Sequence, residues 1–346
     1  MNYRWFALPI SLLLSQGHVH AQSVEEFYKN NRLTLIVGYA AGGAYDAYTR
    51  LLARHIVRHI PGTPTAVVQN MPGAGSVVAA NYVFNVGRSD GSVLGAFHQR
   101  IGIEPRLQPA KQMRFDGREF TWIGSIANNV SVCVTWHAAG LKTVEDLKSR
   151  EITVGASANV DSAAVFARAT NAVLGARMKV VIGYGTEETN LALERGEIEA
   201  RCGWGYSSLV ATKPEWLQQG MVHIPLVFGM ERLPELPQTP TLMEFVKKSE
   251  DKGALEVLFA TQEIARPIAG HPRIPKERVE ALRNAFDLAL ADPQLLMEAK
   301  KSAIDLQPIR GVQIEELIRR LYDLPPEAYQ RVHEFLSPAA GEIQRK

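Results

Sequence analysis

The fold class is decided by the stretch LTLIVGYAAGGAYD at residues 33–46. Its first five residues form a short apolar run, which predicts a buried strand. The glycines that follow predict a tight turn, and Asp46 opens an amphipathic helix that continues to about His59. A buried strand, a Gly-rich turn and a helix in this order are typical of a parallel sheet covered by helices.

The same unit recurs along the chain. The sequence predicts strands at residues 65–69, 92–97, 130–136, 152–155, 179–182, 198–202, 222–228 and 255–265. It predicts helices at residues 76–86, 162–174, 189–195, 276–291 and 312–324. This alternation indicates an α/β protein, and 346 residues are enough for two cores.

Composition excludes several classes of protein. The formal net charge is +2 and no concentrated basic stripe is present, which argues against a nucleic-acid partner. The first 21 residues carry Arg4, an apolar stretch from Phe6 to Leu14, and small residues at Val19 and Ala21. This pattern predicts a signal peptide at residues 1–21, cleavage before Gln22 and a soluble protein in the periplasm.

The glycine-rich loop is the first candidate binding element. Free N–H groups at the start of a helix favour an anion, and glycines let the backbone approach it closely. The loop lacks the Gly-Lys-Ser/Thr ending of a nucleotide-binding loop, so a carboxylate is the expected anion. Asp46 either caps the helix or contacts the ligand, and the sequence leaves both roles open.

A second strand-to-helix turn follows more than 100 residues later. Ser157, Asn159, Asp161 and Ser162 offer hydroxyl, amide and carboxylate groups there. An ordinary capped turn is the alternative interpretation. Two such turns in two α/β units favour a ligand held between lobes.

Catalytic and metal-binding patterns are poor. The sequence has no Gly-x-Ser-x-Gly nucleophile motif and no His-Glu-x-x-His zinc helix, so neither an enzyme nor a metal or other cofactor is expected. Arg201 and Trp204 follow a predicted strand and are pocket candidates. The two cysteines, Cys133 and Cys202, are either one disulfide of an oxidising compartment or two buried thiols.

Four motifs resemble those of one family, the tripartite tricarboxylate transporter receptors, or Bug family of periplasmic binding proteins. Residues 39–46 are similar to its Pro-Phe-x-Ala-Gly-Gly-x-x-Asp signature, and residues 68–75 to its Val-Glu-Asn-Arg-Pro-Gly-Ala-Gly. Residues 90–94 and 196–199 resemble its Asp-Gly-Tyr-Thr-Leu and Gly-Glu-Val-Asp segments. The resemblance runs in order from about residue 33 to residue 320.

The resemblance implies a two-lobed periplasmic-binding-protein fold (Venus flytrap, type II), with a mixed sheet in each lobe and no enzymatic activity. It implies that both loops hold a ligand carboxylate and that a tyrosine at the position of Tyr184 lies at the cleft. The candidate ligand-binding residues are therefore Tyr39, Ala41, Gly42, Gly43, Asp46, Ser157, Asn159, Asp161, Ser162, Tyr184, Arg201 and Trp204.

Three departures from the family pattern bear on the ligand. Gly38-Tyr39 stands where Pro-Phe is usual, and Ala158 and Val160 stand where glycines are frequent. The segment 201–204 replaces a common Met-Phe-Asp, whose aspartate would meet an amino group of the ligand. This loss argues against an acidic amino acid and favours a second carboxylate or an aromatic ring.

We expect residues 31–128 plus 256–305 to form the first lobe and residues 129–255 the second, with residues 306–346 packing across both. The expected function is capture of a di- or tricarboxylate or an aromatic acid by a monomer, for a permease made of separate integral-membrane subunits. Two alternatives stay open: a protein that presents its ligand to a membrane histidine kinase, and a periplasmic hydrolase.

Overall fold

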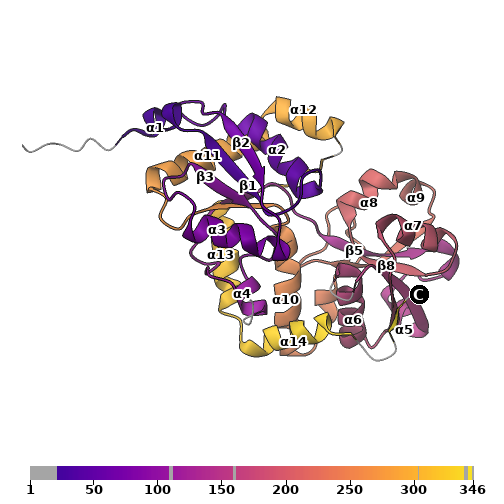
Figure 1. The fold of residues 1–346 in the computed structure, drawn as a ribbon. Coiled ribbons are helices and arrows are strands. Elements are labelled where there is room, and N and C mark those ends of the chain that lie inside the picture. The colour runs from indigo at the N-terminus through magenta and orange to yellow at the C-terminus, as the bar shows by residue number, and fades with distance from the viewer. Residues whose placement is uncertain (1–21, 109–111, 159–160, 303, 339–341, 345–346) are drawn as a thin grey trace, which may run out of the picture.

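The computed structural model describes residues 22–108, 112–158, 161–302, 304–338 and 342–344. The expected signal peptide at residues 1–21 lies outside these ranges. In Figure 1 the chain forms two α/β bodies side by side, each built on one sheet. We call the body that holds β1 (Leu33–Val37) the first lobe and the body that holds β8 (Ala200–Gly205) the second lobe.

The first lobe is built on a six-stranded mixed sheet in the order β11-β4-β10-β3-β1-β2. β1 is parallel to both of its neighbours, whereas β10 is antiparallel to β3 and β4. Leu33, Leu35, Ile36 and Val37 are at most 1% exposed, as expected for a strand covered on both faces. The other strands are β2 (Ala66–Asn70), β3 (Val93–Ala96), β4 (Thr121–Ser125), β10 (Pro267–Gly270) and β11 (Ile309–Arg310). The helices are α1 (Val24–Asn30), α2 (Ala44–Ile56), α3 (Val77–Asn85), α4 (Glu104–Leu107), α11 (Lys276–Ala291) and α12 (Pro293–Lys301).

The second lobe has a six-stranded sheet in the order β12-β7-β6-β8-β5-β9. β6 is parallel to β7 and β8, and β5 is antiparallel to β8 and β9. Its further strands are β5 (Ser131–Trp136), β6 (Glu151–Ala156), β7 (Arg177–Ile182) and β9 (Val222–Phe228). Its helices are α5 (Val144–Ser149), α6 (Ser162–Leu174), α7 (Thr186–Glu194), α8 (Tyr206–Thr212) and α9 (Pro214–Gln218). The predicted α/β class with a mixed sheet in each lobe is therefore confirmed.

Parallel pairing brings the candidate loops to one edge of each sheet. Val37 of β1 lies beside Ala96 of β3, so the residues after both strands leave the same edge. Ala156 of β6 lies beside Ile182 of β7 in the same way. Ligands of open α/β sheets bind outside these carboxyl ends.

One predicted strand is wrong. Residues 255–265, expected to be a strand, belong mostly to helix α10 (Ser249–Glu263), and the chain enters the first sheet only at β10. Most residues from Ala254 to Gln262 are buried, so the apolar residues follow one another without a period. Such a run fits a buried strand and a buried helix equally well. The expected lobe boundary at residues 255 and 256 consequently falls inside this helix.

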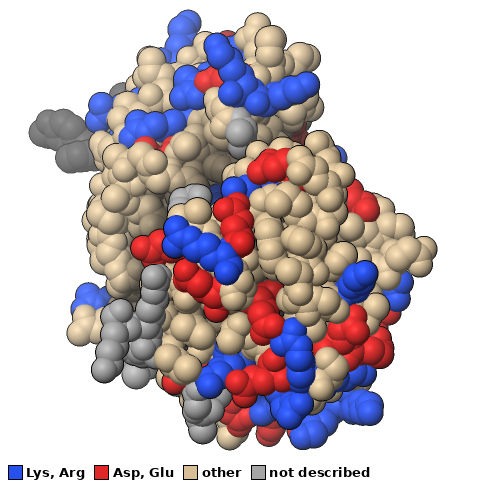
Figure 2. Space-filling view, turned by 90° about the vertical axis from the view of Figure 1, so that its right-hand side faces the viewer, with Lys and Arg blue, Asp and Glu red and all other residues tan. Residues whose placement is uncertain are grey.

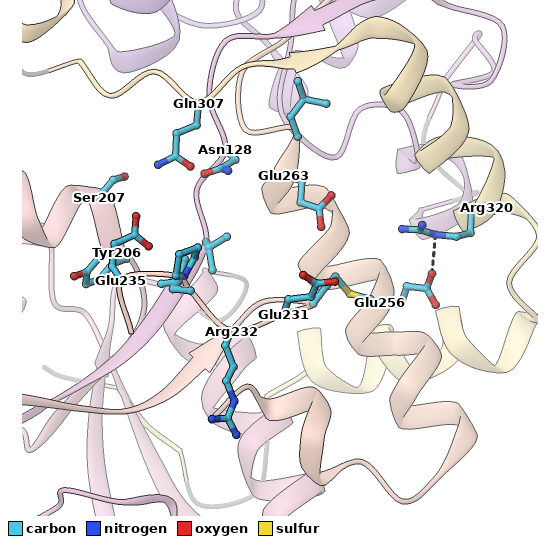
Figure 3. A pocket seen from close by; sticks show the side chains of 15 residues that line it. Asn128, Tyr206, Ser207, Glu231, Arg232, Glu235, Glu256, Glu263, Gln307 and Arg320 are labelled. Atoms are coloured by element: carbon cyan, nitrogen blue, oxygen red, sulfur yellow. Dashed lines mark ion pairs between the residues drawn. The ribbon is translucent and has the colours of Figure 1, made fainter. Parts of the chain in front are cut away.

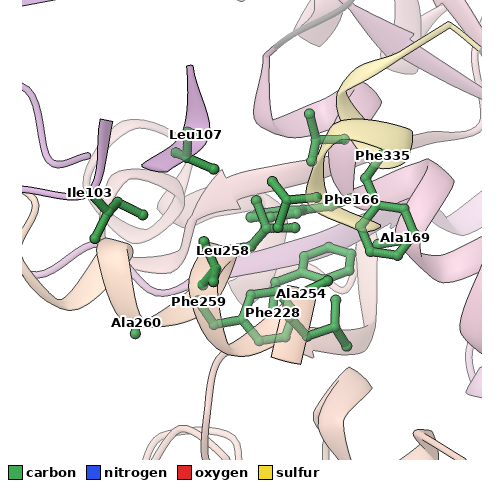
Figure 4. Packing of buried hydrophobic residues seen from close by; sticks show 14 of the residues in the cluster. Ile103, Leu107, Phe166, Ala169, Phe228, Ala254, Leu258, Phe259, Ala260 and Phe335 are labelled. Atoms are coloured by element: carbon green, nitrogen blue, oxygen red, sulfur yellow. The ribbon is translucent and has the colours of Figure 1, made fainter. Parts of the chain in front are cut away.

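Helix α10 lies between the lobes and joins their hydrophobic cores (Figures 1 and 4). Phe259 packs edge-on against Phe166 of α6, with ring centroids 5.6 Å apart, and lies 6.2 Å from Phe228 of β9. The same cluster of buried residues includes Ile103 and Leu107 of the first lobe. Because one cluster of buried residues contains side chains from both lobes, the lobes share a hydrophobic core. Full burial of one phenylalanine contributes roughly 1.5–3 kcal/mol to the stability of such a core.

Backbone hydrogen bonds tie together the segments that cross between the lobes. The Ile126 amide donates to the Arg266 carbonyl at 3.1 Å, and the Ala265 amide donates to the Ala127 carbonyl at 3.1 Å. The side chain of Gln262 adds a buried link, donating to the Phe228 carbonyl at 2.7 Å.

The C-terminal part of the chain contacts both lobes. Helix α13 (Gly311–Tyr322) packs against β4, α14 (Pro326–Leu336) packs against α10 and α6, and β12 (Ile343–Gln344) pairs with β7. Arg168 of α6, whose side chain is 5% exposed, donates from Nη2 to Glu342 Oε2 at 2.7 Å and from Nη1 to the Phe335 carbonyl at 3.0 Å. A buried ion pair therefore fastens the C-terminal segment to the second lobe.

Cys133 and Cys202 form a disulfide between the neighbouring strands β5 and β8. Both residues are buried, at 0% and 1% exposure. The bridge joins positions 69 residues apart.

We expect Glu342→Ala to lower the free energy of unfolding by about 3–5 kcal/mol, because it removes the carboxylate from a buried ion pair. Urea unfolding measures this change. The double variant Arg168→Met/Glu342→Ala removes both charges and should recover part of the loss. Glu316→Ala, at an exposed position of α13, is the matched control. Equal losses in Glu342→Ala and in the control would contradict the expectation.

Reduction of the Cys133–Cys202 bridge should lower the melting temperature. Chain-entropy estimates give about 4 kcal/mol of stabilisation for a closed loop of this length. Calorimetry with and without reductant measures the effect. Titration of the unfolded, unreduced protein should detect no free thiol, and two thiols per chain would refute the bridge.

Candidate ligand-binding site

The first candidate loop joins β1 to α2. Gly42 has φ +84°, a backbone conformation that favours glycine. The chain turns at this residue, and α2 begins two residues later, at Ala44. The residue before the helix, Gly43, has no side chain to cap the helical N–H groups. The N–H groups of the first helical turn therefore lack a capping side chain at this position.

Asp46 folds back onto this loop. Its Oδ2 accepts hydrogen bonds from the Gly42 amide at 2.8 Å and from Arg50 Nε at 2.9 Å. Its Oδ1 accepts from Asn70 Nδ2 at 2.9 Å, and that same nitrogen donates to the Tyr39 carbonyl at 3.0 Å. Both carboxylate oxygens are thus engaged within the protein.

The ion pair with Arg50 lowers the pKa of Asp46 from 3.8 to about 2, with further help from the Gly42 and Asn70 hydrogen bonds. Asp46 is only 4% exposed, so its charge is placed to hold the loop rather than to face solvent.

The second candidate loop, between β6 and α6, is built in the same way. Asp161 caps α6 by accepting from the Ala164 amide at 3.0 Å through Oδ1. Its Oδ2 accepts from the amide and the hydroxyl of Ser157, both at 2.6 Å. In each lobe an aspartate therefore binds the amide of the residue four positions before it. Asn159 lies outside the described residues.

A pocket of about 230 Å³ opens beside the second loop. Five of the predicted residues line it: Ser157, Asp161, Ser162, Tyr184 and Arg201.

Trp204 stands behind this pocket rather than in it. Its ring supports Arg201, whose guanidinium carbon lies 3.9 Å from the ring centroid. Arg201 also donates from Nη1 to Asn190 Oδ1 at 2.6 Å. Trp204 is 7% exposed and packs edge-on against Trp216. Trp204 therefore orients Arg201. The sequence predicted direct ligand contact for Trp204 and not this supporting role.

Tyr39, Tyr45, His98 and Arg266 form an aromatic and cationic wall beside the first loop. Of these four residues the sequence predicted only Tyr39. The rings of Tyr39 and Tyr45 stack with centroids 4.4 Å apart, and the Arg266 guanidinium lies 4.4 Å from the Tyr45 centroid. His98 is tilted against both tyrosines at 6.4 Å. Tyr45 lies within the motif at residues 39–46, so its position in that motif could have marked it as a candidate. His98 and Arg266 are remote in sequence and gave no such signal.

Burial is the main cause of the shifted pKa values of Tyr39 and His98. It raises the pKa of Tyr39 to about 12, with a smaller contribution from Tyr45. It lowers the pKa of His98 to about 3, helped by the positive charges of Arg100 and Arg266. The tyrosines and the histidine are therefore neutral at physiological pH.

A different cavity, of about 760 Å³, lies between the lobes beside α10 (Figure 3). Four glutamates line it: Glu231, Glu235, Glu256 and Glu263. Glu256 pairs with Arg320 at 2.9 Å, and burial raises the pKa of Glu263. None of the predicted residues lines this cavity, and its carboxylates make it a poor place for an anion.

The predicted residues thus fall into two groups, one on each lobe. Figure 2 looks onto the second lobe and shows the surface hollowed between the upper and lower parts of the molecule, with basic side chains gathered above. Within the described ranges, no cluster of three or more His, Cys, Asp and Glu side chains suits a metal ion. No helix of the described residues is long and apolar enough to cross a membrane.

Two curated proteins are similar to the chain in sequence. No model of a known protein family matches the chain. The UPF0065 protein of the Agrobacterium vitis TAR-I ttuE–ttuC′ intergenic region is 24% identical over 304 residues, covering 86% of this chain and 81% of that protein. A UPF0065 protein of Cupriavidus necator is 23% identical over 278 residues, covering 78% of each chain.

Solved structures share the two-lobed fold. A TctC solute-binding protein from Polaromonas superposes with a TM-score of 0.69 at 21% identity, over 89% of this chain and 99% of that one. MatC from Rhodopseudomonas palustris with bound malate gives 0.54 at 17% identity, over 89% and 99%. An adipate-bound R. palustris protein gives 0.57 at 20% identity, over 89% and 97%.

The Polaromonas protein is a TctC solute-binding protein, and the resemblance seen in the motifs is confirmed. The chain is similar in sequence to the UPF0065 proteins and shares the two-lobed fold of the TctC and Bug solute-binding proteins.

Proposed function

We propose that the protein is an extracytoplasmic receptor that captures a small carboxylate between its lobes for a tripartite tricarboxylate-type transporter. One observation carries the proposal: each lobe presents a strand-to-helix loop at the carboxyl edge of its sheet, and an aspartate fastens each loop. The malate and adipate bound by proteins of the same fold support this ligand class.

The two loops contribute helix N-termini rather than charged side chains. Because Gly42 donates its amide to Asp46, and Ser157, Ala158 and Ala164 donate theirs to Asp161, the remaining N–H groups of the first helical turns are the ones offered to an anion. We assign direct ligand contact to Tyr39, Ala41 and Gly43 on the first lobe. On the second lobe we assign it to Ser162, Tyr184 and Arg201.

Arg201 is the charged member of the second group. Its guanidinium lines the pocket while Trp204 and Asn190 hold its orientation. A planar guanidinium fixed in this way binds a carboxylate through two parallel hydrogen bonds. The aspartate common in the family at this segment is absent, which supports an acidic ligand without an amino group.

The proposal includes export and a separate membrane partner. Residues 1–21 would direct the chain to the periplasm and be removed, leaving a soluble receptor that begins at Gln22. The receptor would act as a monomer and dock, when closed, on a permease of separate integral-membrane subunits.

A thermal-shift screen of the mature protein tests the ligand class. The panel contains citrate, succinate, malate, adipate, glutamate, nicotinate and phthalate, with glucose and inorganic phosphate as controls. A carboxylate present at about 100 times its dissociation constant should stabilise the protein by about 2.7 kcal/mol. A shift with glucose or phosphate alone, or silence across the whole panel, would refute the proposal.

Asp46→Ala should act mainly on stability, lowering the free energy of unfolding at neutral pH by about 1–2 kcal/mol. The folded pKa of about 2 lies below the ordinary 3.8. The contribution of Asp46 is therefore complete above pH ~4 and is lost as the pH falls towards ~2. Urea unfolding at several pH values measures it, with the exposed Asp323→Ala as control. Unchanged stability with lost carboxylate binding would assign Asp46 to the ligand instead.

A further inference from the structure

Two arginines that are far apart in sequence lie near the same side chains, Tyr39 and His98, at the edge of the first sheet from which the glycine-rich loop emerges. Arg100 follows β3 by four residues, and Arg266 immediately precedes β10. β3 and β10 are antiparallel with Ala96 beside Ile268, so the end of one strand lies next to the start of the other. β1 is parallel to β3, which places Tyr39 at the same edge.

The Arg266 guanidinium is held by aromatic rings. It lies 4.4 Å from the centroid of Tyr45 and 5.1 Å from that of Tyr48, and its Nη1 donates to the Ala265 carbonyl at 2.8 Å. Stacking engages the faces of a guanidinium and leaves its edge for an acceptor. The arginine is therefore oriented before any ligand arrives.

Both arginines have hydrogen-bonding capacity to spare. The Nε atoms of Arg100 and Arg266 are buried and have no hydrogen-bond partner within the described residues. In that part of the chain neither guanidinium forms a salt bridge. A buried donor left without an acceptor is costly, so an arriving anion would be favoured here.

Among the described residues, no carboxylate forms a salt bridge with either arginine. Tyr39, Tyr45 and His98 are neutral, and Asp46 is already paired with Arg50. Asp305 is the acidic residue near Tyr48; among the described residues its buried Oδ2 has no hydrogen-bond partner and it forms no salt bridge with Arg266.

A crevice between the lobes lies close to Tyr48, the ring against which Arg266 packs. Asp305 lines this crevice, of about 390 Å³, together with Tyr206 and Ser207, which follow β8 of the second lobe. The backbone of Asp305 hydrogen-bonds to the Tyr48 hydroxyl, and the Arg266 guanidinium lies 5.1 Å from the Tyr48 ring centroid, so one tyrosine separates the arginine from that crevice.

We propose that Arg100 and Arg266 form a second anion subsite, which selects ligands with two acidic groups, such as a dicarboxylate. This inference rests on the proposed function, because the first acidic group is the one held by the loop amides. The second group takes the place of an acceptor for the buried guanidinium edges. Hydrogen bonds between charged partners correspond to a preference of about tenfold to hundredfold over a monoacid of equal length.

Isothermal titration calorimetry of the mature protein tests the subsite with matched acid pairs. The pairs are succinate and butyrate, adipate and hexanoate, and terephthalate and benzoate. In the wild-type protein at least one diacid should bind about tenfold or more tightly than its monoacid. Arg100→Gln and Arg266→Gln should each remove most of that preference, while the affinity for the monoacid stays within about threefold.

Arg273→Gln is the matched control. Arg273, like Arg100, comes two residues after a histidine whose Nδ1 accepts its backbone N–H. Arg273 is exposed and follows the far end of β10, so its removal changes the net charge equally without touching the wall. Arg266→Lys, which retains charge but loses the planar edge, covers the case in which Arg266→Gln fails to fold.

The outcomes separate the inference from the function on which it rests. A diacid preference that survives in both glutamine variants, or that falls equally in Arg273→Gln, overturns the subsite but leaves the carboxylate receptor intact. Failure of the wild-type protein to bind any acid overturns the proposed function and the subsite with it. Loss of the preference in Arg100→Gln and Arg266→Gln alone establishes the subsite.

Discussion

The packing of helix α10 between the two sheets is the contact on which the arrangement of the molecule depends. Phe259 meets Phe166 and Phe228 of the second lobe, and the same buried cluster reaches Ile103 and Leu107 of the first. The lobes therefore cannot part without exposing a shared apolar core. Any closing motion is confined to changes that preserve this packing, and the hydrogen-bonded segments beside it are the natural place for them.

The two candidate loops are closed by the same kind of hydrogen bond. An aspartate in the first turn of a helix, or just before it, binds the amide four residues earlier and closes the loop. The negative charge of Asp46 is buried, whereas Asp161 lines the second-lobe pocket; both carboxylates stabilise a helix start. Asp46 is compatible with an anion-binding motif because its charge is paired with Arg50, and Asp161 has both oxygens engaged by backbone and hydroxyl donors.

Local sequence patterns accounted for much of the architecture. The helices at residues 162–174 and 276–291 and the strand at residues 222–228 agree with the predicted bounds, because their periods and end signals are clear. The run at residues 255–265 failed because a helix buried on all sides has no polar face to reveal its period. For the site, the loops were predictable from glycines and caps, whereas Arg266 was not. Arg266 lies near Tyr45 and in the same neighbourhood as Arg100 because β10 pairs antiparallel with β3. No local sequence pattern predicts such a long-range pairing.

The pairing of Arg168 with Glu342 has a consequence for the way in which the chain becomes a protein. The two residues are separated by 174 positions, and β12, which follows Glu342, completes an edge of the second sheet. A chain that emerges from a ribosome or a translocation pore with its N-terminus first delivers the carboxylate long after helix α6. The second lobe therefore cannot reach its final packing while the chain is still being released. Vectorial emergence would keep this lobe loosely folded until the last segment arrives and locks it.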